Sequence, residues 1–187
     1  MRVTRVTTAD LDRLEFDAVR SGEHGRVAAQ LQDLANRIDS ASEVSRAELF
    51  VRSGEQWEIA QEFVRACAAY QRAMDDGGPT VVDARALHAG ALLQMDETDL
   101  AYSHFERLER DEPDGVATYL HITEVLYAHG DHDGAERWAT SGVRRSLEGE
   151  LTAWSRDLLE ELLRIRFRIR TDLGLAEDEL DRCLDEA

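Results

Sequence analysis

The sequence predicts an all-α fold: a right-handed solenoid of helix-turn-helix units with a capping helix at its C-terminus. Three observations predict this fold. Ala, Leu, Glu and Arg, which favour helices, are abundant, whereas Val and Ile are sparse. Apolar residues recur three or four positions apart in nearly every window, which is the spacing of one helix face. The pattern itself repeats along the chain with a period of about 34 residues.

The composition excludes several classes of protein. The 187 residues include 22 basic side chains, all of them Arg, and 39 acidic ones, so the formal net charge is −17. Such a chain repels phosphate, and we expect it to bind neither nucleic acid nor an anionic membrane. The hydrophobic fraction of 43% is too large for a disordered chain. The complete replacement of Lys by Arg is typical of a GC-rich bacterial coding bias.

The sequence contains no targeting or disulfide signal. The first residues carry Arg2 and Arg5 without a following apolar segment, and no apolar run approaches the ~18 residues of a membrane span. We therefore expect a cytoplasmic protein. Cys67 and Cys183 are too far apart in sequence to suggest a disulfide framework or a zinc site, and Cys67, between two Ala residues, is expected to be buried and unreactive.

The predicted helices follow from apolar stripes that short breaker segments separate. The breakers lie at 22–25, 77–79, 111–115 and 130–134. Capping-box spacing at Ser40–Glu43 and at Thr80–Asp83 predicts two helix starts. The stripes consist of Leu11, Leu14 and Ala18, then Val27, Leu31 and Leu34, then Phe63, Ala66, Tyr70 and Ala73, then Leu100, Phe105 and Leu108, then Leu120, Ile122 and Leu126.

The period is clearest in the second helix of each unit. A small residue followed by an aromatic one at Ala66–Tyr70 recurs at Ala101–Phe105, and Ala135 continues the series. These positions divide one domain into a divergent repeat at 8–41, three clear repeats at 47–80, 82–115 and 116–149, and a C-terminal cap at 150–187. The cap is expected to hold one long helix over 151–173 and a short acidic helix with Leu180 and Leu184, because a repeat stack needs an atypical end unit.

The pattern resembles the tetratricopeptide repeat family, whose units are 34-residue helix-turn-helix pairs. The resemblance implies small residues where helices cross closely and a Gly in the turn between the helices of a unit. It departs at Gln61 and Asp96, which stand where the turn Gly is expected, and at Glu15, which is bulky for a crossing position. The structural positions that it implies are Gly54, Ala66, Ala89, Ala101, Gly130 and Ala135.

The same resemblance implies a peptide-binding groove on the concave face, made by the first helices of successive repeats. In this register the groove is acidic and apolar, and it lacks the basic residues of the family's carboxylate clamp. We therefore expect a basic or amphipathic protein partner. The implied groove residues are Phe16, Val51, Glu55, Glu58, Gly90, Leu93, Leu120, Glu124 and Tyr127.

Residues that could carry other chemistry leave two alternatives open. His129, Asp131, His132 and Asp133 are metal-ligand types, but a polar turn between helices explains them better, and no catalytic motif or cofactor-binding motif occurs. We expect no enzyme activity and no cofactor, with a metal-dependent helical enzyme as the lesser alternative. The other alternative is a structural homo-oligomer, such as a homodimer, that associates through the C-terminal helix.

Four Arg residues alternate with apolar residues along 164–170, and they are the most unusual local feature. The segment 141–170 carries 7 Arg and 5 acids, a net charge of +2, whereas 171–187 carries 1 Arg and 7 acids, a net charge of −6. We expect the Arg run to pair with the acidic residues at 177–181. An anionic partner or a dimer contact is the alternative.

Overall fold

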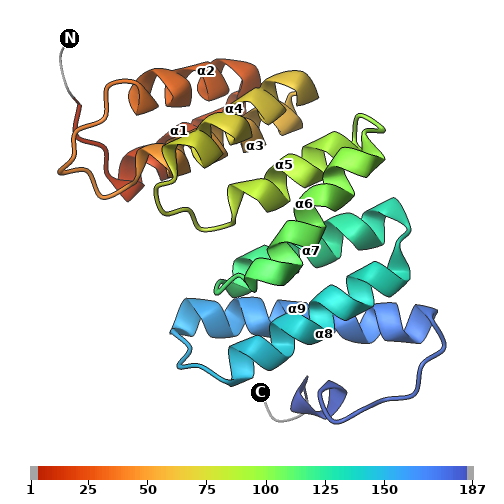
Figure 1. Ribbon diagram of the computed structural model, residues 1–187. Coiled ribbons are helices and arrows are strands. Elements are labelled where there is room, and N and C mark those ends of the chain that lie inside the picture. Colours follow the sequence, from red (N-terminus) through yellow and green to blue (C-terminus); the bar gives the residue numbers. More distant parts are fainter. Residues whose placement is uncertain (1–3, 185–187) are drawn as a thin grey trace. The chain divides into compact units, whose positions relative to one another are not determined.

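A computed structural model describes residues 4–184, and within them the prediction of an all-helical chain is confirmed (Figure 1). These residues form nine α-helices, one 3-10 helix and no strand, apart from an isolated bridge between Thr4 and Ile38. No helix among them is both long and apolar enough to cross a membrane. The helices are α1 (Thr8–Ser21), α2 (His24–Ala35), α3 (Arg46–Ile59), α4 (Phe63–Asp76), α5 (Ala84–Leu93), α6 (Thr98–Asp111), α7 (Val116–His129), α8 (His132–Leu147) and α9 (Ala153–Asp172), followed by the 3-10 helix η1 (Asp181–Leu184).

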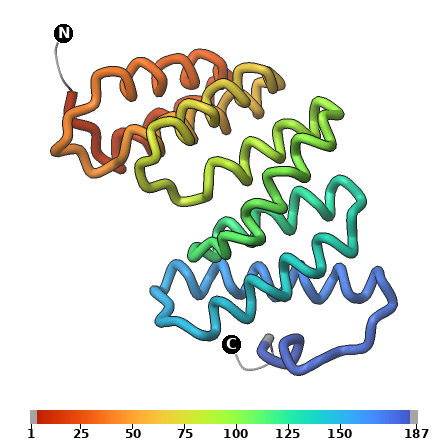
Figure 2. The backbone as a smooth tube through the Cα atoms, in the orientation of Figure 1, coloured from red at the N-terminus to blue at the C-terminus, as the bar shows by residue number. Residues whose placement is uncertain are grey.

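The chain divides into two compact units, Met1–His104 and Phe105–Ala187, so the boundary falls within α6. In unit 1 each helix packs on the next one in sequence, from α1 to α5, and the chain reverses direction at each turn (Figure 2). The core of unit 1 is continuous, and its fully buried side chains come from every one of these helices. They include Ala18, Val27, Leu31, Leu49, Tyr70 and Ala91.

In unit 2, α9 packs against both α7 and α8. Its apolar stripe faces these helices because Leu159, Leu162, Leu163 and Ile169 recur at helical spacing and are all buried. The predicted long helix over 151–173 is therefore present as α9. The predicted short acidic helix is present only as η1, a 3-10 helix of four residues.

Two predicted helix starts are wrong by three to five residues. The cap of α3 is Ser45 rather than Ser40, and its side chain accepts a hydrogen bond from Glu48 N at 2.8 Å. The cap of α5 is Asp83 rather than Thr80. The residues before α3 instead bind the N-terminal segment, since Val6 N donates to the Ser42 hydroxyl at 3.0 Å. A capping-box spacing alone does not show which of two nearby polar residues is the N-cap of the helix.

The turns within the units use a left-handed residue where the repeat pattern places a Gly. Gly22 has φ 72° and Gly130 has φ 89°. Gln61 and Asp96 occupy the corresponding positions of two other units, and both have φ 62°. This conformation costs an ordinary L-residue roughly 1–2 kcal/mol, so the backbone geometry of the turn is kept even where the Gly is missing.

Two buried glycines allow helices to approach closely. A Cβ atom at Gly54 of α3 would clash with the Tyr70 ring of α4. A Cβ atom at Gly142 of α8 would lie 2.5 Å from Tyr119 Cβ of α7 and 2.9 Å from Leu162 Cδ2 of α9. Gly142 therefore marks the point where α8 meets both of its neighbours.

Replacing Gly142 by Ala is expected to lower the unfolding free energy by about 1–2 kcal/mol. Ala favours a helix by about 1 kcal/mol over Gly, but the new methyl group must displace Tyr119 close to its backbone. Urea unfolding measures the difference. Gly149→Ala is the control, because no atom lies within 4 Å of a Cβ at that position. Equal stability of the Gly142→Ala variant and the parent would contradict this close crossing.

Candidate protein-binding surface

Four carboxylates lie near one another on α1 and α3 of unit 1, and three of them surround one guanidinium. We call Glu15, Glu48, Glu55 and Glu58 the acidic cluster. Arg52 lies among them: its Nε is 2.7 Å from Glu48, and its Nη1 is 3.7 Å from both Glu15 and Glu55. The helix repeat places Glu48, Arg52 and Glu55 on one face of α3, and the packing of the unit adds Glu15 of α1 to that face.

The fourth carboxylate, Glu58, is tied to the packing of α4. The Tyr70 hydroxyl donates a hydrogen bond to Glu58 at 2.7 Å. Glu48 is only 6% exposed and also accepts the backbone N–H of Val81 at 2.9 Å. Two members of the acidic cluster are therefore fixed by the fold, whereas Glu55 pairs with Arg52 alone among residues 4–184.

The acidic cluster is electrostatically unfavourable. Burial is the main cause that raises the pKa of Glu55 to about 7; Arg52 opposes this shift, and the neighbouring Glu48, Glu15 and Glu58 carboxylates add to it. Burial also raises the pKa of Glu15 and of Glu58. The Glu15 Oε1 atom is buried and has no hydrogen-bond partner among the described residues. Among the described residues, Arg52 alone pairs with Glu15, Glu48 and Glu55, so it compensates their negative charge only in part.

Replacing Glu55 by Gln is expected to stabilise unit 1 by about 1–2 kcal/mol at pH 8, after a reduction for its partial exposure. The folded-state pKa, about 7, lies above the unfolded value near 4.5. The unfolded chain therefore binds fewer protons across this window, and the parent loses stability as the pH rises from 4.5 to 7. Gln cannot ionise, so the variant does not lose this stability as the pH rises.

Urea unfolding at pH 5 and pH 8 tests this prediction. The stabilisation should be present at pH 8 and nearly absent at pH 5. Glu106→Gln is the matched control, because Glu106 is exposed on α6 and its substitution should change stability little at either pH. A Glu55→Gln variant that is less stable than the parent at pH 8 would show that the pair with Arg52 outweighs the repulsion.

Exposed apolar side chains border the acidic cluster on α1. Phe16 is 66% exposed and Val19 is 73% exposed. Val19 lies four residues after Glu15 on the same face of α1, and Phe16 is the residue that follows Glu15 in the chain. Ile59, which follows Glu58 on α3, is 56% exposed. Large exposed apolar residues beside a charged cluster are typical of an interaction surface.

Four of the residues implied for the groove are buried within their own units. Val51 is 2% exposed, Leu93 is 4% exposed, Leu120 is 7% exposed, and Gly90 is also buried. These residues contribute to helix packing and offer a partner little surface. Phe16, Glu55 and Glu58 are the groove residues of unit 1 that keep accessible side-chain surface.

Glu124 and Tyr127 belong to unit 2, where they lie on α7 beside α9. The Tyr127 hydroxyl donates to Asp172 of α9 at 2.5 Å. Burial raises the pKa of Glu124, and the charge of Glu161 on α9 adds to this effect. The sequence did not predict that α9 lies along Glu124 and Tyr127. Only the packing of α7 against α9 in unit 2 brings these residues close to α9.

The structural positions implied by the repeat pattern lie in the cores. Ala66, Ala89, Ala101 and Ala135 are fully buried, and Gly54 is buried against Tyr70. Gly130 is the left-handed residue after α7. Small residues therefore stand where backbones or rings approach most closely.

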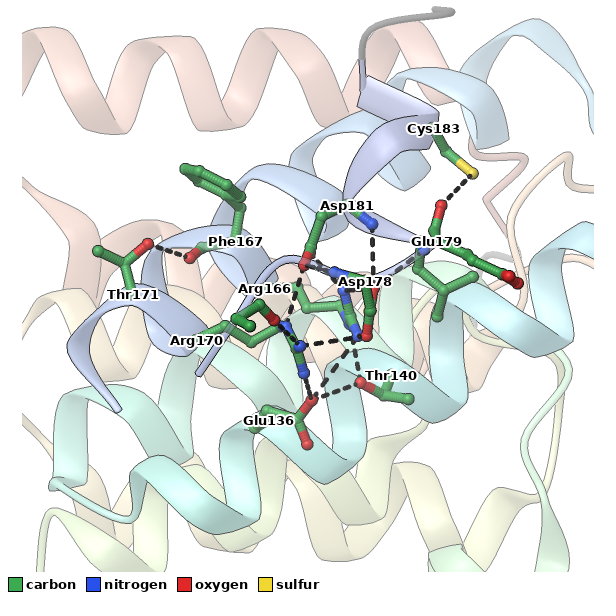
Figure 3. A network of polar contacts seen from close by, with 12 residues as sticks. Glu136, Thr140, Arg166, Phe167, Arg170, Thr171, Asp178, Glu179, Asp181 and Cys183 are labelled. Carbon is green, nitrogen blue, oxygen red and sulfur yellow. Dashed lines mark hydrogen bonds and ion pairs between the residues drawn. The ribbon is translucent and has the colours of Figure 1, made fainter. Parts of the chain in front are cut away.

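The expected pairing of the Arg run with the acidic residues after it is confirmed for Arg166 and Arg170 (Figure 3). Arg166 is only 1% exposed, and its guanidinium binds Asp178 and Asp181. Arg170 binds Asp181 at 3.1 Å and Glu136 of α8 at 2.9 Å. The network fastens the segment after α9 to α8 and α9.

The other two Arg residues of the run differ. Arg164 pairs with Glu160 one turn earlier on α9, and Arg168 is exposed. The alternation of Arg and apolar residues therefore does not produce one basic patch. It distributes the four side chains around α9, as the 3.6-residue repeat of a helix requires.

The His129–Asp133 segment forms the turn into α8. Asp131 caps this helix and accepts a hydrogen bond from Gly134 N at 2.9 Å, and the His132 ring centroid lies 5.0 Å from that of Tyr127. Residues 4–184 contain no group of three or more His, Cys, Asp or Glu side chains placed to hold a metal ion. Burial raises the pKa of the half-buried Cys67 thiol.

The sequence interpretation missed the members of the acidic cluster outside the implied groove, Glu15 and Glu48, and the central Arg52. The spacing of Glu48, Arg52 and Glu55 is a detectable signal for ion pairs along one helix. Nothing in the sequence marks Glu15 as their neighbour, because it is 37 residues from Arg52 in the chain. No protein-family model matches this sequence, and a search of curated proteins finds no match either.

Proposed function

We propose that this protein is a non-catalytic interaction module that binds a basic or amphipathic segment of a partner protein at the acidic cluster. The observation that carries the proposal is the placement of Glu15, Glu48 and Glu55 around the single guanidinium of Arg52. The pKa of Glu55, raised to about 7 mainly by burial, agrees with this excess of negative charge. A Lys or Arg side chain of a partner would supply the missing positive charge. Binding would then lower the pKa of Glu55 and release a proton near neutral pH.

The exposed side chains beside the cluster support an amphipathic partner. Phe16 and Val19 offer apolar contacts at one edge, and Glu15 and Glu55 offer acceptors for charge-assisted hydrogen bonds. A helix with basic and apolar residues three or four positions apart would meet both features at once. A cluster of like charges that destabilises the free protein is typical of a binding surface.

The proposal extends to the fold type and the compartment. We propose that the helix pairs are units of tetratricopeptide type in a right-handed solenoid and that 150–187 caps it. Paired helices of 10–16 residues and left-handed turn residues support this assignment. We also propose a cytoplasmic location, in keeping with free thiols at both Cys67 and Cys183.

The test combines Glu55→Arg with Glu58→Gln. Affinity capture from native extract first identifies a partner, and titration calorimetry with the purified partner then measures its affinity between 50 and 300 mM salt. We expect the double variant to bind at least tenfold more weakly and with a shallower salt dependence, because fewer ion pairs form.

The control for this test places equivalent changes elsewhere. Glu106→Arg with Glu109→Gln alters two exposed carboxylates of α6 in unit 2 and makes the same change in net charge. This variant should bind as the parent does. A partner that binds the parent and the acidic-cluster variant equally would refute the assignment of the surface, whatever the partner is.

A second candidate function is self-association through α9. Trp154 is 54% exposed and Phe167 is 40% exposed, both on this helix. Light scattering of the parent and of a Trp154→Ser variant separates this function from the first. A dimer that the substitution dissociates would favour it, and a monomer at high concentration would exclude it.

A further inference from the structure

Two histidines of unit 1 meet between successive helices. His88 lies on α5 and His104 on α6, and both rings are half buried. The His88 Nδ1 atom is 3.1 Å from the His104 Nε2 atom. The ring centroids are 5.0 Å apart, and the ring planes are inclined at 78°. The two nitrogens therefore face each other within hydrogen-bonding distance.

We propose that His88 and His104 form a two-imidazole site for a divalent transition-metal ion, with Cu²⁺ as the preferred ion. Imidazole nitrogen binds such ions at about 2.0–2.1 Å. At these bond lengths, nitrogens 3.1 Å apart subtend an angle of about 98° at the metal. This angle lies between the values for square-planar and tetrahedral coordination, so the nitrogen separation suits one ion once the two rings turn their lone pairs toward it.

The protonation state of the pair suits metal binding. Burial lowers the pKa of His88 to about 4, and the nearby His104 ring contributes to the same shift. In the metal-free pair one ring N–H donates to the other ring. Metal binding requires that ring to adopt its other tautomer, and no proton has to leave either imidazole.

The surroundings leave the remaining positions to water. No third His, Cys, Asp or Glu among residues 4–184 completes a metal-binding group with this pair. Half-buried rings keep one side open to solvent, and the net charge of −17 attracts cations to the protein. Two-imidazole coordination predicts the affinity order of the Irving–Williams series, with Cu²⁺ above Ni²⁺ and Zn²⁺. Binding would join α5 to α6.

The experiment uses the full chain without an affinity tag, freed of metal by chelation. Separate titrations with CuCl₂, NiCl₂ and ZnCl₂ are followed by calorimetry and by thermal unfolding. We expect one ion per chain at this site and a higher Tm in the presence of Cu²⁺. His88→Asn and His104→Asn should each weaken Cu²⁺ binding at least tenfold. His132→Asn is the control and should leave the affinity for this ion unchanged.

A measurement on the parent alone keeps the test decisive if a variant unfolds. Substoichiometric Cu²⁺ should broaden the ring NMR signals of His88 and His104 before those of the other four histidines. Equal Cu²⁺ affinity in the folded His88→Asn variant and the parent would overturn the proposal. Loss of binding in His132→Asn instead, or broadening that begins at His129 and His132, would overturn it as well.

Discussion

Replacing Arg166 by Met is expected to lower the unfolding free energy by about 3–5 kcal/mol. Met preserves most of the volume of the buried stem but removes the guanidinium. Asp181, which is buried, would then keep only Arg170 as its cationic partner, and Asp178 would lose its main one. Breaking a buried ion pair on one side costs more than the pair contributes, because the remaining charge stays desolvated.

The unfolding free energy of the variant is measured by urea titration at pH 7. Arg164→Met is the matched control: it lies on the same helix and pairs with Glu160, but its side chain is exposed, so its loss should cost at most about 0.5 kcal/mol. If Arg166→Met were as stable as Arg164→Met, the network would contribute nothing to folding. The segment after α9 would then be held by other contacts.

The same network predicts how the parent responds to acid. The hydrogen bond from Arg166 lowers the pKa of Asp178 to about 2, below the unfolded value of 3.8. A lowered pKa stabilises the folded state at every pH above the unfolded value. This contribution should be lost as the pH falls from about 4 to 2, and the loss should be absent in Arg166→Met.

Replacing Tyr70 by Ala is expected to lower the unfolding free energy by about 3–5 kcal/mol. Tyr70 is fully buried, and its ring lies directly against Gly54, where no Cβ atom could fit. Its removal would leave a cavity between α3 and α4 that their backbones, already close together, cannot fill. The loss is measured by urea unfolding, with the exposed Phe16→Ala as the control, for which we expect a change within about 0.5 kcal/mol.

Tyr70→Phe separates the ring from its hydroxyl group. Phe keeps the packing and removes only the hydrogen bond to Glu58, so a loss of about 1 kcal/mol is expected. The pKa of Glu58, which that hydrogen bond lowers, should rise further in this variant. If Tyr70→Phe lost as much stability as Tyr70→Ala, the hydrogen bond to the acidic cluster would matter more than the packing of the ring.

The sequence by itself determined the helices and, apart from the first residues of α3 and α5, their approximate ends. Apolar residues three or four positions apart define helix faces, and that spacing is a local property of the chain. The same reasoning located the turns: Gln61 and Asp96 adopt the left-handed conformation at positions where the repeat pattern requires a Gly. The contrast in charge between 141–170 and 171–187 was enough to predict the pairing of Arg166 and Arg170 with the acidic residues that follow.

The tertiary structure alone decided which residues meet across helices and how deeply each is buried. Glu15 joins Glu55 around Arg52, and His88 meets His104, although no local spacing marks either meeting. Burial removed Val51, Leu93 and Leu120 from the accessible surface, and it raised the pKa of Glu55. Desolvation and charge interactions act through space over a few ångströms, so they depend on packing and not on distance along the chain.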